Sequence, residues 1–408
     1  MSGDRRPRLF VSAGLPGIGG RIKSAPEDFR VDEVPSTTPA GRGEFVWIRV
    51  EKRRLSTPEA VAWVARRLRV PASQVRSAGL KDASAVASQW LSVRGRTPAD
   101  VAAASADLES ERLRVLDARA HTRAIRVGEF AGNRFEARVR GVVPDALTRA
   151  RAILAVLEAR GVPNYYGPQR YGRGGDNHLF VEDLVRRGAR AALQRAGGES
   201  GDEEDAAAAG RNGPNRGPAE SAVARLPRTL LWLYISAFQS ALFDKCVTAR
   251  LDGPLGIDAL RVGDLALDRR TRMVYEVGSD ESASGLRERA AAFEATATGP
   301  IVGERMVSPS GEPGRLEASV LEPMADVTAR LAHLFPGVRP TGTRRALRFR
   351  VEDLDVREAV ADGELALDVA FFLESGAYAT TFLRELTKAE PAAPPAAPES
   401  IATGDDEG

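Results

Sequence analysis

Cysteine and histidine are almost absent from this chain of 408 residues. Cys246 is the single cysteine, so no internal disulfide can form, and its apolar helical surroundings predict a buried, unreactive thiol. The three histidines, His121, His178 and His333, are too dispersed to show the spacing of metal ligands. We therefore expect no metal site.

Long apolar runs are also missing. No segment approaches the ~18 residues of a membrane-spanning helix, and Met1 to Arg8 leads into no signal-like apolar region. The sequence thus predicts a cytoplasmic protein without a membrane partner. The Gly-rich pieces at 17–20 and 172–175 lack the preceding strand and the Gly-Lys-Ser/Thr of a nucleotide-binding loop, which excludes ATP on this pattern.

Charge is nearly balanced overall, with a formal net charge of +2, but it is unevenly distributed. Residues 1–195 contain 35 Lys and Arg against 21 Asp and Glu, and residues 196–408 contain the remaining 23 against 35. The first part therefore carries a net charge of +14 and the second −12. A basic region of this size favours contact with nucleic-acid phosphates, although arginines scattered over solvated faces would give the same count.

The length predicts two or three domains. Alternating and β-branched patterns predict strands, and apolar residues at helical spacing predict helices. Thr57 and Pro58 are expected to open the first helix, and Gly161 to end the second. Residues 196–227 have the composition of a mobile insertion, and 391–408 that of a disordered tail. The expected strands are 29–34, 45–50, 90–93, 123–127, 135–140, 347–351 and 365–373, and the expected helices are 57–70, 144–160, 230–251 and 379–388.

Asp82 is the strongest candidate for a reactive group. It stands in the small-residue turn Ala78-Gly79-Leu80-Lys81-Asp82, before an apolar strand-like segment. A turn aspartate that satisfies backbone donors is the alternative, and it would be preferred if the turn stood alone. Polar and aromatic clusters recur downstream at 133–135, 164–172 and 376–380, which favours the reactive site.

The aromatic residues of these clusters allow two interpretations. Phe29 and Phe135 lie on the apolar faces of their strands, where burial is the ordinary outcome. Beside an amide such as Asn133, however, an aromatic ring can also hold an unstacked base. The run 164–172 is rich in Gly and Tyr; it can be a purely structural turn, but its Arg170 is also suited to bind an RNA phosphate.

Together these motifs resemble the TruD-type tRNA pseudouridine synthases, and the resemblance extends over nearly the whole chain. Six segments occur in the family's order: 23–29, 78–82, 132–135, 161–172, 236–243 and 376–386. The resemblance implies conversion of uridine 13 in certain tRNAs, with Asp82 as the catalytic aspartate. It further implies that Phe29, Asn133, Phe135 and Tyr378 border the uridine, where Tyr378 replaces a common Phe. Lys23, Lys81, Gln169, Arg170 and Arg384 lie in the same segments and are further candidate contacts to RNA.

The resemblance also implies an α+β fold, with a mixed, largely antiparallel sheet and flanking helices. The catalytic domain would combine residues 1–167 and 334–390, interrupted by an inserted α/β domain at 168–333. The reaction would require no cofactor, and the partner would be tRNA, with no obligate protein partner evident. Pseudouridylation breaks the C1′–N1 bond and joins C1′ to C5, which one carboxylate can promote by covalent attack on C1′ or by removing a 2′ proton.

Three other functions fit parts of the pattern. A non-catalytic RNA-binding protein would show the same basic half and aromatic clusters. A hydrolase would need a second carboxylate or a histidine near Asp82. A pseudouridine synthase could also act on an RNA other than tRNA.

Overall fold

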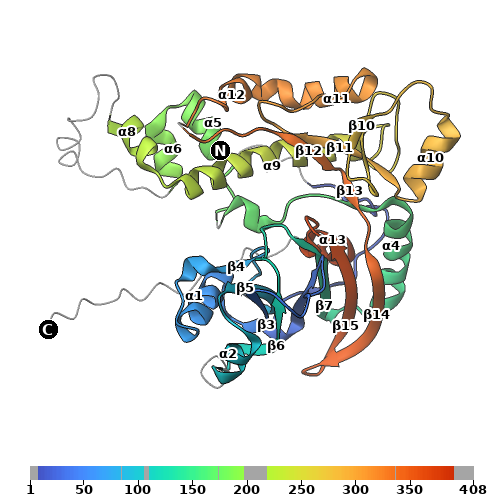
Figure 1. Ribbon diagram of the computed structural model, residues 1–408. Coiled ribbons are helices and arrows are strands. Elements are labelled where there is room, and N and C mark those ends of the chain that lie inside the picture. Colours follow the sequence, from blue (N-terminus) through green and yellow to red (C-terminus); the bar gives the residue numbers. More distant parts are fainter. Residues whose placement is uncertain are drawn as a thin grey trace. The chain divides into compact units, whose positions relative to one another are not determined.

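The computed structural model describes residues 8–83, 85–104, 110–172, 174–196, 218–335 and 337–389 (Figure 1). The chain divides into two compact units. The large-sheet unit consists of the described residues of Phe10–Asn164 and Arg348–Ala389, and the inserted unit consists of the described residues of Tyr165–Leu347 with Arg8 and Leu9. The expected tail at 391–408 lies outside the described residues.

The large-sheet unit is built on a nine-stranded sheet with the order β14-β15-β7-β2-β5-β3-β6, in which β1 also pairs with β7 and β4 with β5. Every pairing is antiparallel except that of β2 with β5. The strands are β1 (Gly19–Arg21), β2 (Phe29–Pro35), β3 (Phe45–Arg53), β4 (Val75–Ser77), β5 (Val86–Arg94), β6 (Leu113–His121), β7 (Phe130–Val142), β14 (Glu352–Ala361) and β15 (Glu364–Glu374). The expected mixed, largely antiparallel sheet is thus confirmed.

Helices α1 (Thr57–Arg67), α2 (Pro98–Ala103), α4 (Ala146–Arg160) and α13 (Ala379–Thr387) belong to the same unit. Helix α1 begins with a capping box, in which the Ser56 hydroxyl accepts from the Glu59 N–H and the Ser56 N–H donates to the Glu59 carboxylate. Thr57 was expected to cap this helix, but it stands one residue further on. Gly161 ends α4 with φ 78°, a conformation that favours glycine, as expected. A short pair of strands, β8 (Val162–Pro163) and β13 (Arg348–Phe349), follows.

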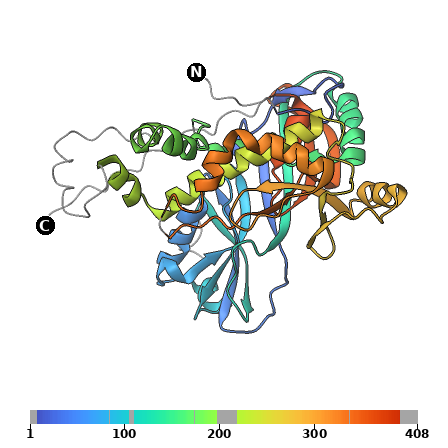
Figure 2. The same ribbon diagram turned by 90° about the horizontal axis from the view of Figure 1, so that it is seen from above.

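The inserted unit combines helices with a four-stranded antiparallel sheet, in the order β10-β9-β11-β12. Its strands are β9 (Leu265–Asp268), β10 (Val274–Glu276), β11 (Ala295–Ile301) and β12 (Thr343–Ala346). Its helices are α5 (Leu179–Arg186), α6 (Ala189–Arg195), α8 (Pro218–Arg225), α9 (Arg228–Asp252), α10 (Ala283–Ala291), α11 (Gly311–Leu321) and α12 (Ala325–Arg330). The long helix α9 packs against α5, α11 and β11 (Figures 1 and 2). Because β12 pairs with β11, residues 334–347 stay with this unit, whereas the sequence analysis placed the boundary after 333.

The prediction of a mobile segment over 196–227 is wrong at its C-terminal end. Residues 218–225 form α8, and Val223 is buried in the core of the inserted unit. Leu226 packs against the same core, which explains why this part of a polar, Ala-rich segment is ordered. Residues 197–217 lie outside the described part of the chain.

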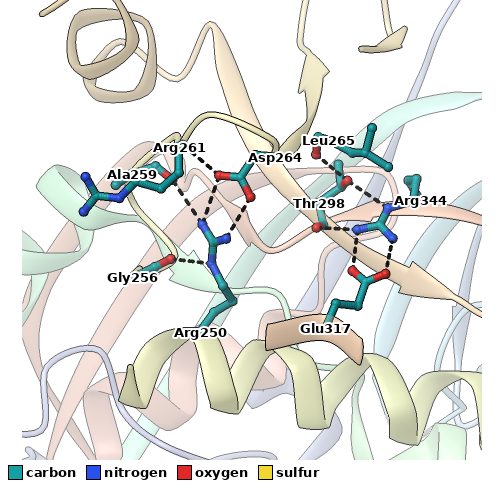
Figure 3. A network of polar contacts seen from close by, with 9 residues as sticks. All are labelled: Arg250, Gly256, Ala259, Arg261, Asp264, Leu265, Thr298, Glu317 and Arg344. Carbon is teal, nitrogen blue, oxygen red and sulfur yellow. Dashed lines mark hydrogen bonds and ion pairs between the residues drawn. The ribbon is translucent and has the colours of Figure 1, made fainter. Parts of the chain in front are cut away.

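Two buried ion pairs of the inserted unit link α9 to the residue before β9 and α11 to β12 (Figure 3). The Arg250 guanidinium on α9 lies 2.8 Å from an Asp264 oxygen and also donates to the Gly256 carbonyl. The Arg344 guanidinium on β12 donates to both Glu317 oxygens at 2.7 Å, and to the Thr298 carbonyl at 2.8 Å. Cys246 is buried nearby in α9, and burial raises the pKa of its thiol well above the ordinary value, as expected for an unreactive cysteine.

Candidate active site

Asp82 lies in the connection between β4 and β5, with 39% of its side chain exposed. The ammonium of Lys23 forms an ion pair with its Oδ2 atom. Lys23 stands between β1 and the turn that leads into β2, and its backbone has φ 58°, which is uncommon for a residue other than glycine. Its Nζ atom also lies 4.5 Å from the centre of the Phe29 ring. Asp82 is therefore an accessible carboxylate with a cation held against it.

Lys81, the neighbour of Asp82, points in the opposite direction, into the core. Its Nζ atom lies 2.7 Å from Glu33 Oε2 and donates to Asn133 Oδ1 at 2.8 Å. The same ammonium lies 4.3 Å from the centre of the Phe130 ring. Only 4% of the Lys81 side chain and 2% of the Glu33 side chain are exposed. Lys81 was a candidate contact to RNA, and its burial in this ion pair assigns it a structural role instead.

The backbone at Lys81 and Asp82 is held from β3 and from the start of α1. The Lys52 ammonium donates to the carbonyls of Leu55 at 2.6 Å, Asp82 at 2.9 Å and Lys81 at 3.3 Å. The Lys81 N–H donates to the Thr57 hydroxyl at 2.9 Å, and that hydroxyl donates to Gln89 Oε1 on β5. The turn that carries Asp82 is thus attached to three elements of the unit.

Phe29 and Phe135 lie next to each other in the core, with ring centres 5.8 Å apart. Phe135 stacks on Phe371 at 5.1 Å, and Phe371 contacts Phe382 of α13 at 4.7 Å. Phe29 is 3% exposed and Phe135 is 7% exposed. Both rings are therefore core residues in this structure.

Asn133 and Tyr378 lie at the same end of the sheet. In the register of β7 with β15, Asn133 faces Leu373 and Gly132 faces Glu374. The Ser375 N–H then donates to the Ala131 carbonyl, and Tyr378 follows, half-buried, at the start of α13. Asn133 is joined to the Asp82 turn through Lys81, as described above.

The remaining candidate contacts to RNA are Gln169, Arg170 and Arg384. Gln169 and Arg170 lie in a short 3-10 helix, Pro168–Tyr171, of the inserted unit. Gln169 is exposed, while the Arg170 guanidinium lies 5.1 Å from the Tyr166 ring centre and donates to Ser236 Oγ at 3.3 Å. Arg384 on α13 is only 5% exposed, with its guanidinium 3.9 Å from the Phe10 ring centre. Its burial removes Arg384 from the RNA contacts that we propose.

Three residues that hold the site were missed by the sequence analysis: Glu33, Lys52 and Thr57. The positions of Glu33 and Lys52 in the alternating patterns of their strands could have revealed both residues. Glu33 follows Phe29 and Val31 on the buried face of β2, and Lys52 follows Val46, Ile48 and Val50 on the buried face of β3. A charged residue where alternation demands an apolar one indicates a buried partner.

Two general features of the described residues bear on the class of protein. In ranges 8–83, 85–104, 110–172, 174–196, 218–335 and 337–389, no helix is long and apolar enough to cross a bilayer. In the same part of the chain, no group of three or more Asp, Glu, His or Cys side chains is placed to hold a metal ion.

Comparison with known proteins gives a consistent picture. The family model of tRNA pseudouridine synthase D (TruD) matches residues 8–213 and 211–386. The chain is 39% identical to the tRNA pseudouridine synthase D of Geobacter metallireducens, over 95% of this chain and 99% of that protein. It is 40% identical to the protein of the same name from Anaeromyxobacter dehalogenans, over 93% and 96%. A crystal structure of a TruD protein from Methanosarcina mazei shares the fold, with a TM-score of 0.74 at 22% identity, over 94% of this chain and 96% of that one.

The fold and the family match define an RNA-modifying isomerase, a tRNA pseudouridine synthase. Within that class, the chain belongs to the TruD family.

Proposed function

We propose that this chain converts uridine 13 of tRNA to pseudouridine, with Asp82 as the catalytic group. The observation that carries the assignment is the Asp82 carboxylate itself, which is accessible and paired with Lys23, while the Asp82 carbonyl accepts from Lys52 of β3. A nearby ammonium stabilises the charged form of a carboxylate, which is the form that can act as nucleophile or base. The proposal rests on family membership for the substrate and on this geometry for the catalytic residue.

The reaction needs only groups that the site supplies. The C1′–N1 bond breaks, the uracil turns and C5 bonds to C1′; C5 then gives its proton to solvent, and N1 takes up a proton from solvent. Asp82 promotes the first step, either by bonding to C1′ and leaving again when C5 attacks, or by taking the 2′ proton and returning it. Lys23 keeps the carboxylate oriented in both routes, and the uracil is bordered by Phe29, Asn133, Phe135 and Tyr378.

The uridine must leave the folded tRNA to reach Asp82, at a free-energy cost of a few kcal/mol. Contacts to phosphates offset this cost, and we assign them to Lys23 in the large-sheet unit and to Gln169 and Arg170 in the inserted unit. Since its substrate is tRNA, we place the enzyme in the cytoplasm.

The site of modification is tested on the RNA. A tRNA transcript with uridine at position 13 and a transcript with cytidine there are incubated with the enzyme, and pseudouridine is mapped by carbodiimide treatment and primer extension. We expect one new stop, at position 13 of the first transcript, and none in the second. A stop at another position in both transcripts would overturn the assignment of position 13.

A further inference from the structure

Lys52 is a charged residue in the core of the large-sheet unit. It is 1% exposed and lies on the face of β3 that buries Val46, Ile48 and Val50. Placing an ammonium there is unfavourable unless its protons find acceptors. Its acceptors are three backbone carbonyls, and two of them belong to Lys81 and Asp82.

These contacts hold one short piece of backbone from two sides. The Lys52 ammonium binds the carbonyls of Lys81 and Asp82, while the Thr57 hydroxyl accepts the N–H of Lys81. An ammonium bound to carbonyl oxygens makes stronger hydrogen bonds than a neutral donor would. The Asp82 side chain starts from this fixed backbone, and its position opposite Lys23 depends on it.

We propose that Lys52 is a positioning residue for the pseudouridylation reaction, which holds the turn so that the Asp82 carboxylate meets C1′ of the target uridine. The inference rests on the proposed catalytic role of Asp82. Lys52 itself is buried and touches no RNA. Removing it should therefore slow the chemical step and leave tRNA binding nearly intact.

The first test compares Lys52→Met with Lys388→Met. Lys388 is a matched control because its ammonium is also largely buried in the large-sheet unit, where it donates to the Ser12 carbonyl at 3.0 Å and pairs with Glu385. A displacement of a catalytic group by about 1 Å can lower the rate about 100-fold, so we expect a loss in kcat of that order for Lys52→Met. Its Kd for tRNA should change less than about threefold, and Lys388→Met should keep its kcat.

Measuring Asp82→Asn beside Lys52→Met and Lys388→Met separates the positioning role of Lys52 from the catalytic role of Asp82. If Asp82→Asn is inactive while Lys52→Met keeps kcat within about threefold per folded molecule, the positioning role is wrong and the catalytic role of Asp82 stands. If Asp82→Asn retains turnover, the proposed function itself fails.

The pH dependence of the unmodified enzyme gives a second test that does not depend on a variant folding. Burial lowers the pKa of Lys52 to about 8, with Asp82 and Glu59 opposing the shift and Lys81 adding to it. Single-turnover rates should therefore fall as the pH rises above about 8, because a neutral amine binds the carbonyls less strongly. Folding stability should move in the opposite direction, since the unfolded chain keeps this proton up to its ordinary pKa near 10.5.

Lys52→Arg, which stays charged throughout this range, should lose the decline in rate above pH 8. A wild-type rate that is level up to pH 9 would overturn the proposal. So would an unchanged decline in Lys52→Arg.

Discussion

Replacing Glu33 by Gln should destabilise the large-sheet unit strongly, because it leaves the Lys81 ammonium buried without a counter-charge. Glu33 and Lys81 are 2% and 4% exposed, and their charged atoms are 2.7 Å apart. The amide oxygen of the substituted side chain can still accept from the Trp90 N–H, a contact of 3.1 Å in the unmodified chain, so the change mainly removes charge. Of the contacts described above, Lys81 would keep those to Asn133 and to the Phe130 ring.

The size of the expected loss of stability follows from the burial of the Glu33 and Lys81 side chains. Breaking a buried ion pair by removing one partner costs about 3–5 kcal/mol. Removing the proton from an ordinary lysine side chain at pH 7 costs about 4–5 kcal/mol. The loss of stability has an upper limit of about this size, because a buried lysine left without a counter-charge can give up its proton. We therefore expect Glu33→Gln to lower the free energy of unfolding of this unit by about 3–4 kcal/mol. The control Glu44→Gln breaks an ion pair with Arg94 whose side chains are 58% and 66% exposed, and it should cost at most about 1 kcal/mol.

Urea unfolding followed by tryptophan fluorescence can measure this difference in one unit. Trp47, Trp63 and Trp90 lie in the large-sheet unit, and replacing the partly exposed Trp232 by Phe confines the signal to it. The double variant Glu33→Gln/Lys81→Met should be more stable than Glu33→Gln alone, because no uncompensated charge remains. Equal losses of stability in Glu33→Gln and Glu44→Gln would refute the structural role of the Glu33–Lys81 ion pair.

Three further predictions concern the aromatic core, the RNA contacts and the thiol. Phe135→Ala should cost about 3–5 kcal/mol of stability, whereas Phe135→Leu should keep most of the stability and still lower kcat; an unchanged kcat in the latter would remove Phe135 from the uridine site. Arg170→Ala should weaken tRNA binding and reduce the slope of log K against log salt by about one, and an unchanged slope would make Arg170 a structural residue. The Cys246 thiol should resist maleimide in the native protein and react fully in urea, and rapid native labelling would contradict its burial.

Strands and helices with a clear period could be predicted from the sequence. The expected strands at 29–34, 45–50 and 365–373 match β2, β3 and β15, and the expected helix at 379–388 matches α13. The edge strand β6 was missed because its charged residues obscure the alternation. Residues 123–127 were expected to be extended but are irregular, and Ile125 is nevertheless buried against Trp47 and Trp90, which explains the apolar signal.

The side-chain partners within the site could not be predicted in the same way. The motif makes Asp82 the candidate catalytic residue, but nothing local shows that Lys81 turns inward while Lys23, 59 residues away, supplies the paired cation. The inward direction of Lys81 and the pairing of Lys23 depend on the register of β2 with β5 and β7, which brings Glu33 next to Asn133. Long-range pairing of this kind leaves no periodic trace in a single sequence.

Release of tritium from tRNA labelled at C5 of uridine, under single-turnover conditions, tests the catalytic role of Asp82 most directly. Asp82→Asn is compared with Asp368→Asn, whose carboxylate has a similar exposure of 43% and pairs with Arg138 on the same sheet. We expect the unmodified enzyme and Asp368→Asn to release tritium at similar rates. Asp82→Asn should bind the tRNA with nearly unchanged affinity and release none above background. Release by Asp82→Asn within about tenfold of the unmodified rate, a difference of only about 1.4 kcal/mol in the barrier, would contradict the account.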